Sequence, residues 1–370
     1  MMRVLHVGKF YPPHAGGIER VVETLCRSSR GLVENHVLVC NASGDTVEEV
    51  VDGVYVTRVG TMGSVGSVHI APALGSWLRA IPADLIILHE PNPWALLAYA
   101  IARPAAPLFV WYHSEVVRPA LQYAIFYAPL ARFVYRRARR ILVSSPALAK
   151  HAAALEPYQD RVRVVPFAID PAAWAMGPAV PDSGEPFVLF AGRHVGYKGV
   201  DILLHALERR AARAVIVGDG PKRAEWEQLS RQLGLDGRVT FTGEVPDEEL
   251  RRLMHACALL VLPSLTRAEA FGYVQLEAMA AGKPVISTDV PSGVSWVNQD
   301  QRTGIIVAAG DQTALGAAID RLLGDAPLRA RLGAAGRARV EEEFTFGRLR
   351  ERLRLLYEEA AVLPPWPAAC

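Results

Sequence analysis

The chain has 370 residues, of which 51% are hydrophobic and 21% charged, and its formal net charge is +2. This length suggests two or three domains, and the near-neutral charge gives no indication of nucleic-acid binding. Four cysteines without a close pair argue against a disulfide framework or a cysteine-based zinc site, and they suit a reducing cytoplasm.

The N-terminus leads directly into an apolar run, residues 4–8, and lacks the charged start and cleavage site of a secretory signal peptide. The chain also contains no run of about 18 apolar residues free of charge, so we expect no transmembrane helix. These features predict a cytoplasmic protein.

Short apolar runs alternate with longer helical patterns, and this happens twice along the chain. Such alternation predicts an α/β protein with two Rossmann-like domains, each a parallel sheet covered by helices. The first series of predicted strands is 4–8, 36–40, 54–59, 85–89, 108–112, 141–144 and 162–165. The second is 187–191, 214–218, 239–242, 259–262, 285–287 and 304–307.

A segment rich in Pro, Gly and small residues, 171–186, separates the two series and is predicted to be the interdomain linker. We therefore predict an N-terminal domain over 1–170 and a second domain over 187–345. The C-terminal segment, 346–370, is expected to contain a last helix over 346–361. Because ligands of open parallel sheets bind beyond the carboxyl ends of the strands, two such domains facing each other would form one cleft.

Several residues follow predicted strands of the first domain. Gly16 and Gly17 precede a predicted helix, where backbone N–H groups can reach a phosphate or sugar, although an ordinary turn is the alternative. His113 follows the strand 108–112 and is expected at the sheet edge, as either a structural or a functional histidine. Glu115 lies just beyond it and is a candidate acceptor-side residue. Candidate acceptor-side residues at the end of the strand 85–89 are Glu90 and Asn92.

The stretch 118–140 combines aromatic and aliphatic residues with a basic end. It is predicted to be either a core helix with a solvated end or a surface helix that draws the protein to anionic lipid. The arginines at its end are Arg132, Arg136, Arg137, Arg139 and Arg140.

Two cations five positions apart, Arg193 and Lys198, follow the first strand of the second domain. Glycines around them let the backbone approach a ligand, so the pair can neutralise a diphosphate leaving group. A pair of surface cations on a turn is the alternative. Many sugar-nucleotide transferases hold a metal with Asp-x-Asp, a pattern missing from this chain, so we predict no metal site.

Two acids separated by seven residues, Glu269 and Glu277, surround a Phe271–Gly272 break. The residues before them are typical of a buried strand, and 273–281 predict a helix closed by Gly282. Side chains near a helix start lean toward the N-terminus, so both acids can face one crevice. The free N–H groups of that helix start favour an anion there.

This pattern, continued by 282–289 (GKPVISTD), resembles the retaining glycosyltransferases of family 4, which have the GT-B fold. The resemblance spans nearly the whole chain and implies that the last helix crosses back to the N-terminal domain. It implies that Arg193 and Lys198 bind the donor phosphates, that Gly16 and Gly17 form a donor-phosphate loop, and that His113 contacts the donor sugar.

The resemblance also implies roles for the remaining donor-binding residues. Glu277 would bind the nucleotide ribose, while Glu269 and the backbone of Phe271 and Gly272 would hold the sugar hydroxyls. Loops near the nucleotide would contain Gly218 and, as candidate base contacts, Glu244 and Val245. No residue stands out as a covalent nucleophile, and the resemblance implies departure and attack on one face of the sugar.

The segments 274–289 and 291–298 look most like bacterial mannosyltransferases of surface-polysaccharide assembly. The expected partners are therefore GDP-mannose, a glycan or lipid-linked glycan acceptor, and an anionic membrane surface, with no cofactor and no nucleic acid. Two alternatives remain at this point: a non-hydrolysing sugar-nucleotide epimerase of the same fold, and a non-catalytic nucleotide-binding module.

Overall fold

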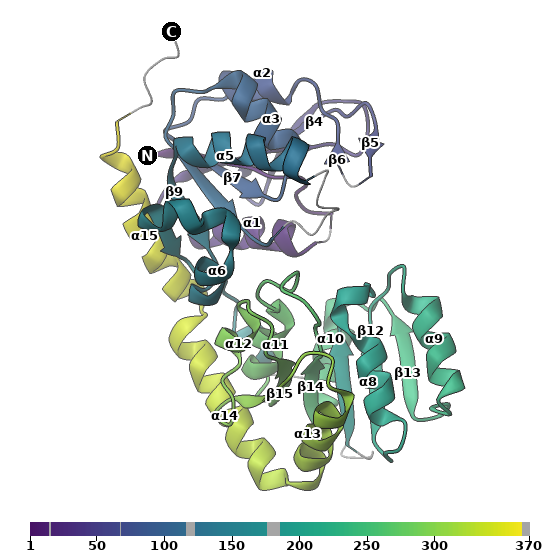
Figure 1. Cartoon of the computed structure of the whole chain (residues 1–370). Coiled ribbons are helices and arrows are strands. Elements are labelled where there is room, and N and C mark those ends of the chain that lie inside the picture. Colours follow the sequence, from purple (N-terminus) through teal and green to yellow (C-terminus); the bar gives the residue numbers. More distant parts are fainter. Residues whose placement is uncertain (15, 67, 116–122, 176–185, 365–370) are drawn as a thin grey trace. The chain divides into compact units, whose positions relative to one another are not determined.

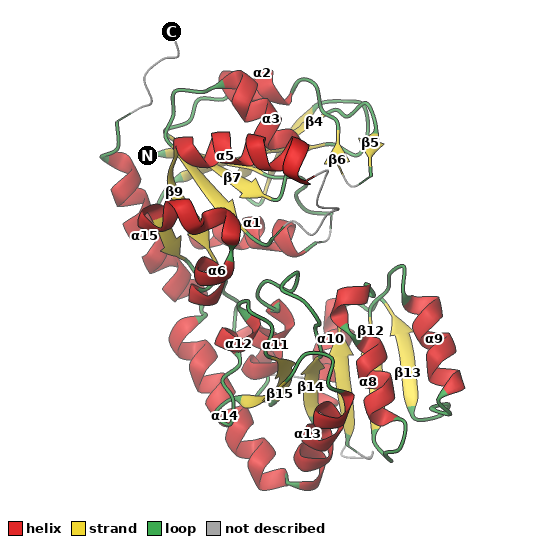
Figure 2. Ribbon diagram, in the orientation of Figure 1, coloured by secondary structure: helices red, strands yellow, loops and turns green. Residues whose placement is uncertain are grey.

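The computed structural model describes residues 1–14, 16–66, 68–115, 123–175 and 186–364 (Figure 1). It divides into two compact units. Unit 1 consists of Met1–Phe167 together with the C-terminal segment from Phe346, and unit 2 is Ala168–Thr345. Each unit is built on its own twisted sheet with helices against it (Figure 2).

Unit 1 contains an eight-stranded sheet in the order β10-β9-β8-β7-β1-β2-β4-β3. All neighbouring pairs are parallel except β3 with β4. Its strands are β1 (Arg3–Val7), β2 (Glu34–Cys40), β3 (Val47–Val51), β4 (Val54–Val59), β7 (Leu85–Glu90), β8 (Leu108–Tyr112), β9 (Ala138–Val143) and β10 (Val162–Val164).

Helices cover both faces of this sheet. On one face α1 packs Val22 and Cys26 against β2 and β4, and the C-terminal helix packs on α1. The opposite face carries the larger apolar core beneath the other helices. The helices of unit 1 are α1 (Gly17–Ser28), α2 (Leu74–Ala80), α3 (Pro93–Ala102), the π-helix η1 (Tyr123–Tyr127), α5 (Ala128–Arg137), α6 (Pro146–His151), the 3-10 helix η2 (Ala153–Arg161) and α15 (Phe346–Ala361).

Unit 2 contains a six-stranded, fully parallel sheet in the order β13-β12-β11-β14-β15-β16. Its strands are β11 (Phe187–Ala191), β12 (Arg213–Val217), β13 (Val239–Gly243), β14 (Leu259–Leu262), β15 (Val285–Thr288) and β16 (Gly304–Val307). Its helices are α7 (Ala172–Ala175), η3 (Gly196–Lys198), α8 (Val200–Leu207), α9 (Arg223–Gln232), α10 (Asp247–Ala256), α11 (Tyr273–Ala280), α12 (Val294–Val297), α13 (Gln312–Gly324) and α14 (Ala326–Glu343).

Two elements of unit 1 were not predicted from the sequence. The edge strand β3 was not predicted, because its mostly exposed residues include Glu48 and Glu49 and lack an apolar run. Such charged edges protect a sheet from pairing with other chains. A short hairpin of β5 (Ser64–Val65) and β6 (Val68–His69) was also not predicted.

The predicted helix over 118–140 is wrong at its end. Helix α5 stops at Arg137, and the chain continues as β9, so Arg139 and Arg140 lie in a strand. Burial of Ala138, Ile141 and Leu142 against the core decides this, since β9 pairs with β8 on one side and β10 on the other. Residues 118–122 of that prediction lie outside the described residues.

The predicted linker lies largely outside the described residues as well, since these omit 176–185. The part that is described includes the short helix α7, in which Trp174 is buried. Helix α7 contacts α11 of unit 2.

Candidate functional site

The predicted donor-binding residues of unit 2 gather at one edge of its sheet. Loops that follow β11, β13 and β14 carry Arg193, Glu244 and Glu269 respectively. Because all six strands are parallel, their carboxyl ends meet at this edge. The structure therefore brings together side chains that are up to 84 residues apart in sequence (193 to 277).

A buried ion pair joins two of these loops. Lys198 Nζ lies 2.6 Å from Glu269 Oε2, and the same oxygen accepts a hydrogen bond of 3.0 Å from Ser264 Oγ. Burial alone would lower the pKa of Lys198, but the Glu269 carboxylate outweighs it and the pKa is raised. Lys198 is therefore charged, and its charge is already neutralised by Glu269.

Arg193 differs from Lys198 in that its side chain is exposed and makes no ion pair within the described part of the chain. The two predicted phosphate-binding cations are thus unequal. Arg193 can meet a ligand directly, whereas Lys198 shares its charge with an acid that is itself predicted to touch the sugar.

Close backbone approach holds the loops in place. Gly199 has φ +66°, and a Cβ there would meet the Pro263 carbonyl oxygen at 2.1 Å. Gly218, with φ +119°, would place a Cβ 2.1 Å from the Gly192 carbonyl oxygen. Only glycine permits both this left-handed backbone and the contact, so the phosphate-side loops depend on these two positions.

Glu277 lies in the second turn of α11 and is buried, with an exposed fraction of 3%. The helix begins after Gly272, whose φ of +71° turns the chain from the β14 loop. The Phe271 side chain packs in the core against Trp296 and Phe344. Its carbonyl oxygen accepts a bond from Gln275 Nε2 at 3.0 Å. Ligand contacts at Phe271 are thus confined to the backbone.

In unit 1, the predicted glycine pair stands at the start of α1. Gly16 is the N-cap and Gly17 the first helical residue, both exposed. Arg58 anchors the preceding loop by donating to the Tyr11 carbonyl oxygen at 3.0 Å. The first turn of a 12-residue helix therefore presents its N–H groups beside a fixed loop.

His113 follows β8 and is nearly fully buried, and burial lowers its pKa to about 3. Its Nε2 lies 2.9 Å from His89 Nδ1, while its Nδ1 has no hydrogen-bond partner among the described residues. The imidazole is thus neutral, with one nitrogen committed to the protein. Glu115 is half-buried two residues further on.

Two of the three acceptor-side candidates, Glu90 and Asn92, have structural partners. Glu90 is fully buried, and its Oε2 accepts a hydrogen bond from Tyr127 Oη. Burial raises the pKa of Glu90 to about 7. Asn92 is the N-cap of α3, where its Oδ1 accepts from the Ala95 N–H at 3.1 Å. An acceptor at these side chains would have to compete with these contacts.

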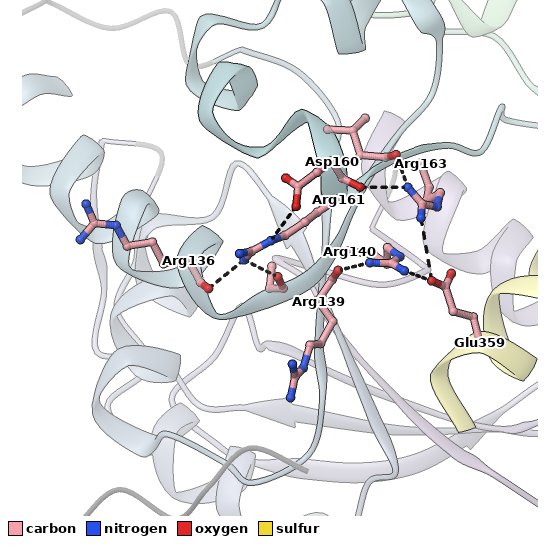
Figure 3. Close-up of polar contacts among 9 residues, drawn as sticks. Arg136, Arg139, Arg140, Asp160, Arg161, Arg163 and Glu359 are labelled. Carbon is pink, nitrogen blue, oxygen red and sulfur yellow. Dashed lines mark hydrogen bonds and ion pairs between the residues drawn. The ribbon is translucent and has the colours of Figure 1, made fainter. Parts of the chain in front are cut away.

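The arginines near the end of α5 fall into two groups (Figure 3). Arg140 is ion-paired with Glu359 of α15, and Arg139 donates to the Pro364 carbonyl oxygen. Arg161 donates to the carbonyl oxygens of Arg136 and Ala138, closing the helix end. The Arg136 guanidinium points away from these contacts, and Arg132 is also exposed.

The two exposed arginines, Arg132 and Arg136, line a surface cavity of about 590 Å³ together with Tyr135, Pro157 and Tyr158. Two exposed apolar side chains, Ile125 and Phe126, precede them in η1. This combination of cations and apolar groups on one helical stretch was only partly visible in the sequence.

Sequence reasoning missed two histidines, His89 and His6. His89 contacts His113 directly, and His6 contacts His89. Each interrupts a run of apolar residues in a buried strand, which was the only available signal. Within the described ranges, no group of three His, Cys, Asp or Glu side chains could hold a metal. No helix in those ranges is long and apolar enough to cross a membrane.

The fold is shared with known glycosyltransferases. Sucrose-phosphate synthase from Thermosynechococcus elongatus superposes with a TM-score of 0.80 at 23% identity, over 97% of this chain and 99% of that one. WaaG, a glycosyltransferase involved in lipopolysaccharide biosynthesis, superposes with a TM-score of 0.72 at 20% identity, over 95% and 99%. The chain therefore has the GT-B fold, as predicted.

Sequence comparison defines the family. Residues 177–339 match the family "Glycosyl transferases group 1", and residues 16–168 match the "Glycosyl transferase 4-like domain". The O-antigen chain mannosyltransferase C of Escherichia coli is 33% identical over 93% of this chain and 95% of its own length. The D-rhamnosyltransferase WbpZ of Pseudomonas aeruginosa is 32% identical over 93% and 92%. The chain belongs to the group 1 glycosyltransferases, which confirms the predicted family.

Proposed function

We propose that this glycosyltransferase moves mannose from GDP-mannose to a hydroxyl of a lipid-linked glycan, with retention of configuration and without an essential metal. The observation that carries this proposal is the set of groups at the carboxyl edge of the unit 2 sheet. There the exposed Arg193, the Lys198–Glu269 pair and the start of α11 lie on neighbouring loops.

The proposed chemistry breaks the bond between C1 of the sugar and the diphosphate oxygen, and it forms a bond between C1 and the acceptor oxygen. The acceptor proton passes to the departing phosphate oxygen on the same face of the sugar. Negative charge grows on the diphosphate, where Arg193, Lys198 and helix N–H groups stabilise it. Glu269 keeps Lys198 charged and in place before the donor arrives.

Two kinds of observation support a manno-configured donor. The mannosyltransferase and the D-rhamnosyltransferase named above cover nearly the whole chain, and D-rhamnose is the 6-deoxy form of D-mannose. The missing Asp-x-Asp pattern, together with two cations at the phosphate position, supports transfer without a metal. Glu277 is assigned to the ribose and Glu269 to the sugar hydroxyls.

A donor screen tests the proposal. Thermal unfolding is measured with GDP, UDP, GDP-mannose and UDP-glucose, because ligand binding to the native state raises its apparent stability. Turnover is then followed with lipid-linked glycan acceptors, and NMR of the product gives the anomeric configuration. Stabilisation by uridine nucleotides alone would contradict the mannose donor, and an inverted product would contradict retention.

The acceptor assignment requires the enzyme to reach a membrane surface. We propose that Arg132 and Arg136, with Ile125 and Phe126 before them, form the contact with anionic lipid. Arg139 and Arg140 are excluded because they hold α15 and the chain after it. Each arginine at an anionic surface contributes about 1 kcal/mol, so losing two weakens binding roughly 30-fold.

Sedimentation with phosphatidylserine vesicles at low and high salt tests this contact. Arg132→Glu/Arg136→Glu is compared with the control Arg79→Glu/Arg213→Glu, whose arginines are also exposed. Both double variants undergo the same change in charge. Only the first should lose binding at low salt, and equal loss in both variants would mean that net charge alone drives it.

A further inference from the structure

A partly exposed salt bridge lies at the carboxyl edge of the unit 2 sheet, beside β12 and β13 (Figure 1). Asp219 belongs to the loop after β12, and Arg223 is the first residue of α9. Arg223 Nη1 donates to Asp219 Oδ2 at 2.9 Å, and the two side chains keep exposed fractions of 33% and 47% respectively. The pair therefore lies at the same edge as the proposed phosphate-binding groups and remains accessible to a ligand.

Backbone hydrogen bonds tie the Asp219 loop to the loop after β11. The His194 N–H donates to the Asp219 carbonyl oxygen at 2.7 Å, and the His194 carbonyl oxygen accepts from the Lys222 N–H at 3.0 Å. A Cβ on Gly220 would lie 2.6 Å from that same His194 oxygen, so the approach of the two loops requires glycine. Because His194 directly follows Arg193, the salt bridge has a fixed place beside the proposed phosphate site.

The guanidinium of Arg223 is held from two directions. Its Nε donates to Glu227 Oε1 at 2.8 Å, while Nη1 bonds to Asp219. Gly243, the last residue of β13, has φ +76°, and a Cβ there would lie 2.9 Å from Nη1. The guanidinium thus lies directly against that glycine. Within the described part of the chain its Nη2 bonds to no other group, so a donor in a fixed position remains available to a ligand.

The Asp219 carboxylate is also fixed, and it is ionised. Its Oδ1 accepts from the Gly220 N–H at 2.6 Å, and its Oδ2 accepts from Arg223. These two hydrogen bonds lower the pKa of Asp219, so near pH 7 the group only accepts hydrogen bonds. Each carboxylate oxygen can accept a second bond. Side by side, the salt bridge offers a ligand a donor from the arginine next to two acceptors from the aspartate.

Guanine presents the complementary groups. Its Watson–Crick edge carries the O6 acceptor, the N1–H donor and the N2 amino donor in a row. An arginine can donate to O6, and a carboxylate can accept from N1–H and the amino group together. Uracil has the acceptor O2 where guanine has the amino group, so a carboxylate oxygen would face another oxygen. Adenine places its amino donor opposite the arginine, where guanine has O6.

We propose that Asp219 and Arg223 are specificity-determining residues that select a guanine nucleotide, with Arg223 Nη2 donating to O6 and the Asp219 carboxylate accepting from N1–H and the N2 amino group. This inference rests on the proposed function, which takes GDP-mannose as the donor. The strand order supports it, because Arg193 follows β11 and Asp219 follows the next strand, β12. The predicted base contacts, Glu244 and Val245, follow β13 beyond it. A base bound at β12 and β13 would direct its phosphates toward β11.

Calorimetric titration with GDP, xanthosine diphosphate and UDP tests the assignment. Xanthine differs from guanine in carrying an oxygen in place of the N2 amino group. Asp219→Asn replaces one acceptor by an amide donor, which suits that oxygen. The ratio of the Kd for GDP to the Kd for xanthosine diphosphate should therefore rise at least about 10-fold over the wild type. A merely structural role of Asp219 would weaken both ligands alike and leave this ratio unchanged.

A second variant and a matched control test the arginine. Arg223→Met removes the donor to O6 and should weaken GDP binding about 10-fold. Binding of inorganic pyrophosphate, which has no base, should stay unchanged, and its loss would place Arg223 at the phosphates instead. Asp320→Asn is the control, because Asp320 on α13 makes an equivalent salt bridge with Arg210 at 2.8 Å. This control should leave the ratio of the two Kd values at the wild-type level.

The outcomes separate this inference from the function on which it rests. If the wild type binds UDP more tightly than GDP, the proposed donor is wrong and the base assignment falls with it. If the wild type prefers GDP and Asp219→Asn leaves the ratio unchanged, the donor stands and Asp219 does not read the base. A change of the ratio in Glu244→Gln, without one in Asp219→Asn, would move the carboxylate role to the loop after β13.

Discussion

Both units are parallel sheets under helices, yet they bury their polar groups in different ways. Unit 1 buries three neutral histidines in or directly after its strands, together with a Glu90 carboxyl whose pKa burial raises to about 7. Unit 2 buries a charged pair, Lys198 with Glu269, in loops beyond its strands. Loops that meet at one edge can supply a counter-ion, whereas the histidines of unit 1 have one another as partners and Glu90 has the Tyr127 hydroxyl. Burial thus shifts the pKa values of polar groups in unit 1, whereas in unit 2 an ion pair keeps a buried lysine charged.

The largest expected effect concerns the charged pair. Lys198→Met leaves Glu269 buried without its cation, and removal of one partner from a buried pair costs about 3–5 kcal/mol of unfolding free energy. Lys198→Met/Glu269→Gln should recover much of that loss. Urea unfolding of the two single variants and the double variant measures the coupling. Additive effects would mean that the pair behaves as two separate groups.

The next prediction concerns transfer. Arg193→Ala should lower kcat/KM about 10²-fold or more, since it removes charge stabilisation at the departing diphosphate. Its exposed side chain makes no ion pair within the described residues, so the unfolding midpoint should stay unchanged. Steady-state kinetics and a thermal melt are measured together. Wild-type turnover would refute the phosphate role of unit 2.

Acidification should destabilise the two units to different extents. The folded pKa values of the three histidines lie below the unfolded value of about 6.5, so their stability contribution is lost as the pH falls from there toward 4. By pH 5 the three rings together cost about 6 kcal/mol relative to pH 7. Glu90 acts in the opposite direction, because its raised pKa stabilises the fold as the pH falls from about 7 toward 4.5. Protonation of Glu90 therefore offsets about 2 kcal/mol of the stability lost through the histidines.

The net expectation is that unit 1 loses about 4 kcal/mol of unfolding free energy between pH 7 and pH 5. Burial also lowers the pKa values of His194 and His255 in unit 2, but by less than those of the three histidines in unit 1. Hydrogen exchange followed by mass spectrometry reports on peptides of each unit separately. If peptides of unit 2 open first on acidification, the buried histidines do not control acid stability.

A smaller effect separates the two acids of unit 2. Glu277→Ala should weaken binding of the nucleoside diphosphate about 10-fold, because a ribose contact exists in the ground state and the transition state alike. Glu269→Ala should mainly lower kcat. Calorimetric titration with GDP, together with kinetics, resolves the two. Unchanged GDP affinity in Glu277→Ala would contradict the ribose assignment.

The smallest expected effect is that of a chelator. If Arg193 and Lys198 neutralise the diphosphate, excess EDTA should leave transfer within about twofold of the untreated rate. Added magnesium or manganese should bring no recovery beyond that. Complete loss with EDTA and restoration by either metal would assign the charge stabilisation to a metal instead.

Much of the fold could be predicted because the buried strands are continuous apolar runs. The bounds of β8, β11, β14 and β16 were predicted to the residue. The edge strand β3 could not be predicted, because exposed edge residues carry no hydrophobic pattern. Arg139 and Arg140 were assigned to the end of a helix, where arginine is favourable. In the structure this segment pairs with β8, so both residues lie in β9.

The candidate site also divides into features that the sequence predicted and features that it did not. Motifs within one loop or one helix start, such as Glu269 to Glu277 and Arg193 to Lys198, were visible because the sequence itself sets their spacing. Which of those groups are neutralised was not visible. The Lys198–Glu269 bond joins loops 71 residues apart (198 to 269), and their approach depends on glycine at position 199.

The sequence by itself determined the family, the two-sheet architecture and the acidic and basic loops. These features depend on burial and turn formation, which the types of neighbouring residues specify locally. The tertiary structure decided which charges are paired and which arginines are exposed. It also decided that three histidines, in or directly after separate strands, are joined by two hydrogen bonds. The physical reason is register. A shift of one residue between β1 and β7, or between β7 and β8, would move a ring to the other face of the sheet, and no local pattern specifies that alignment.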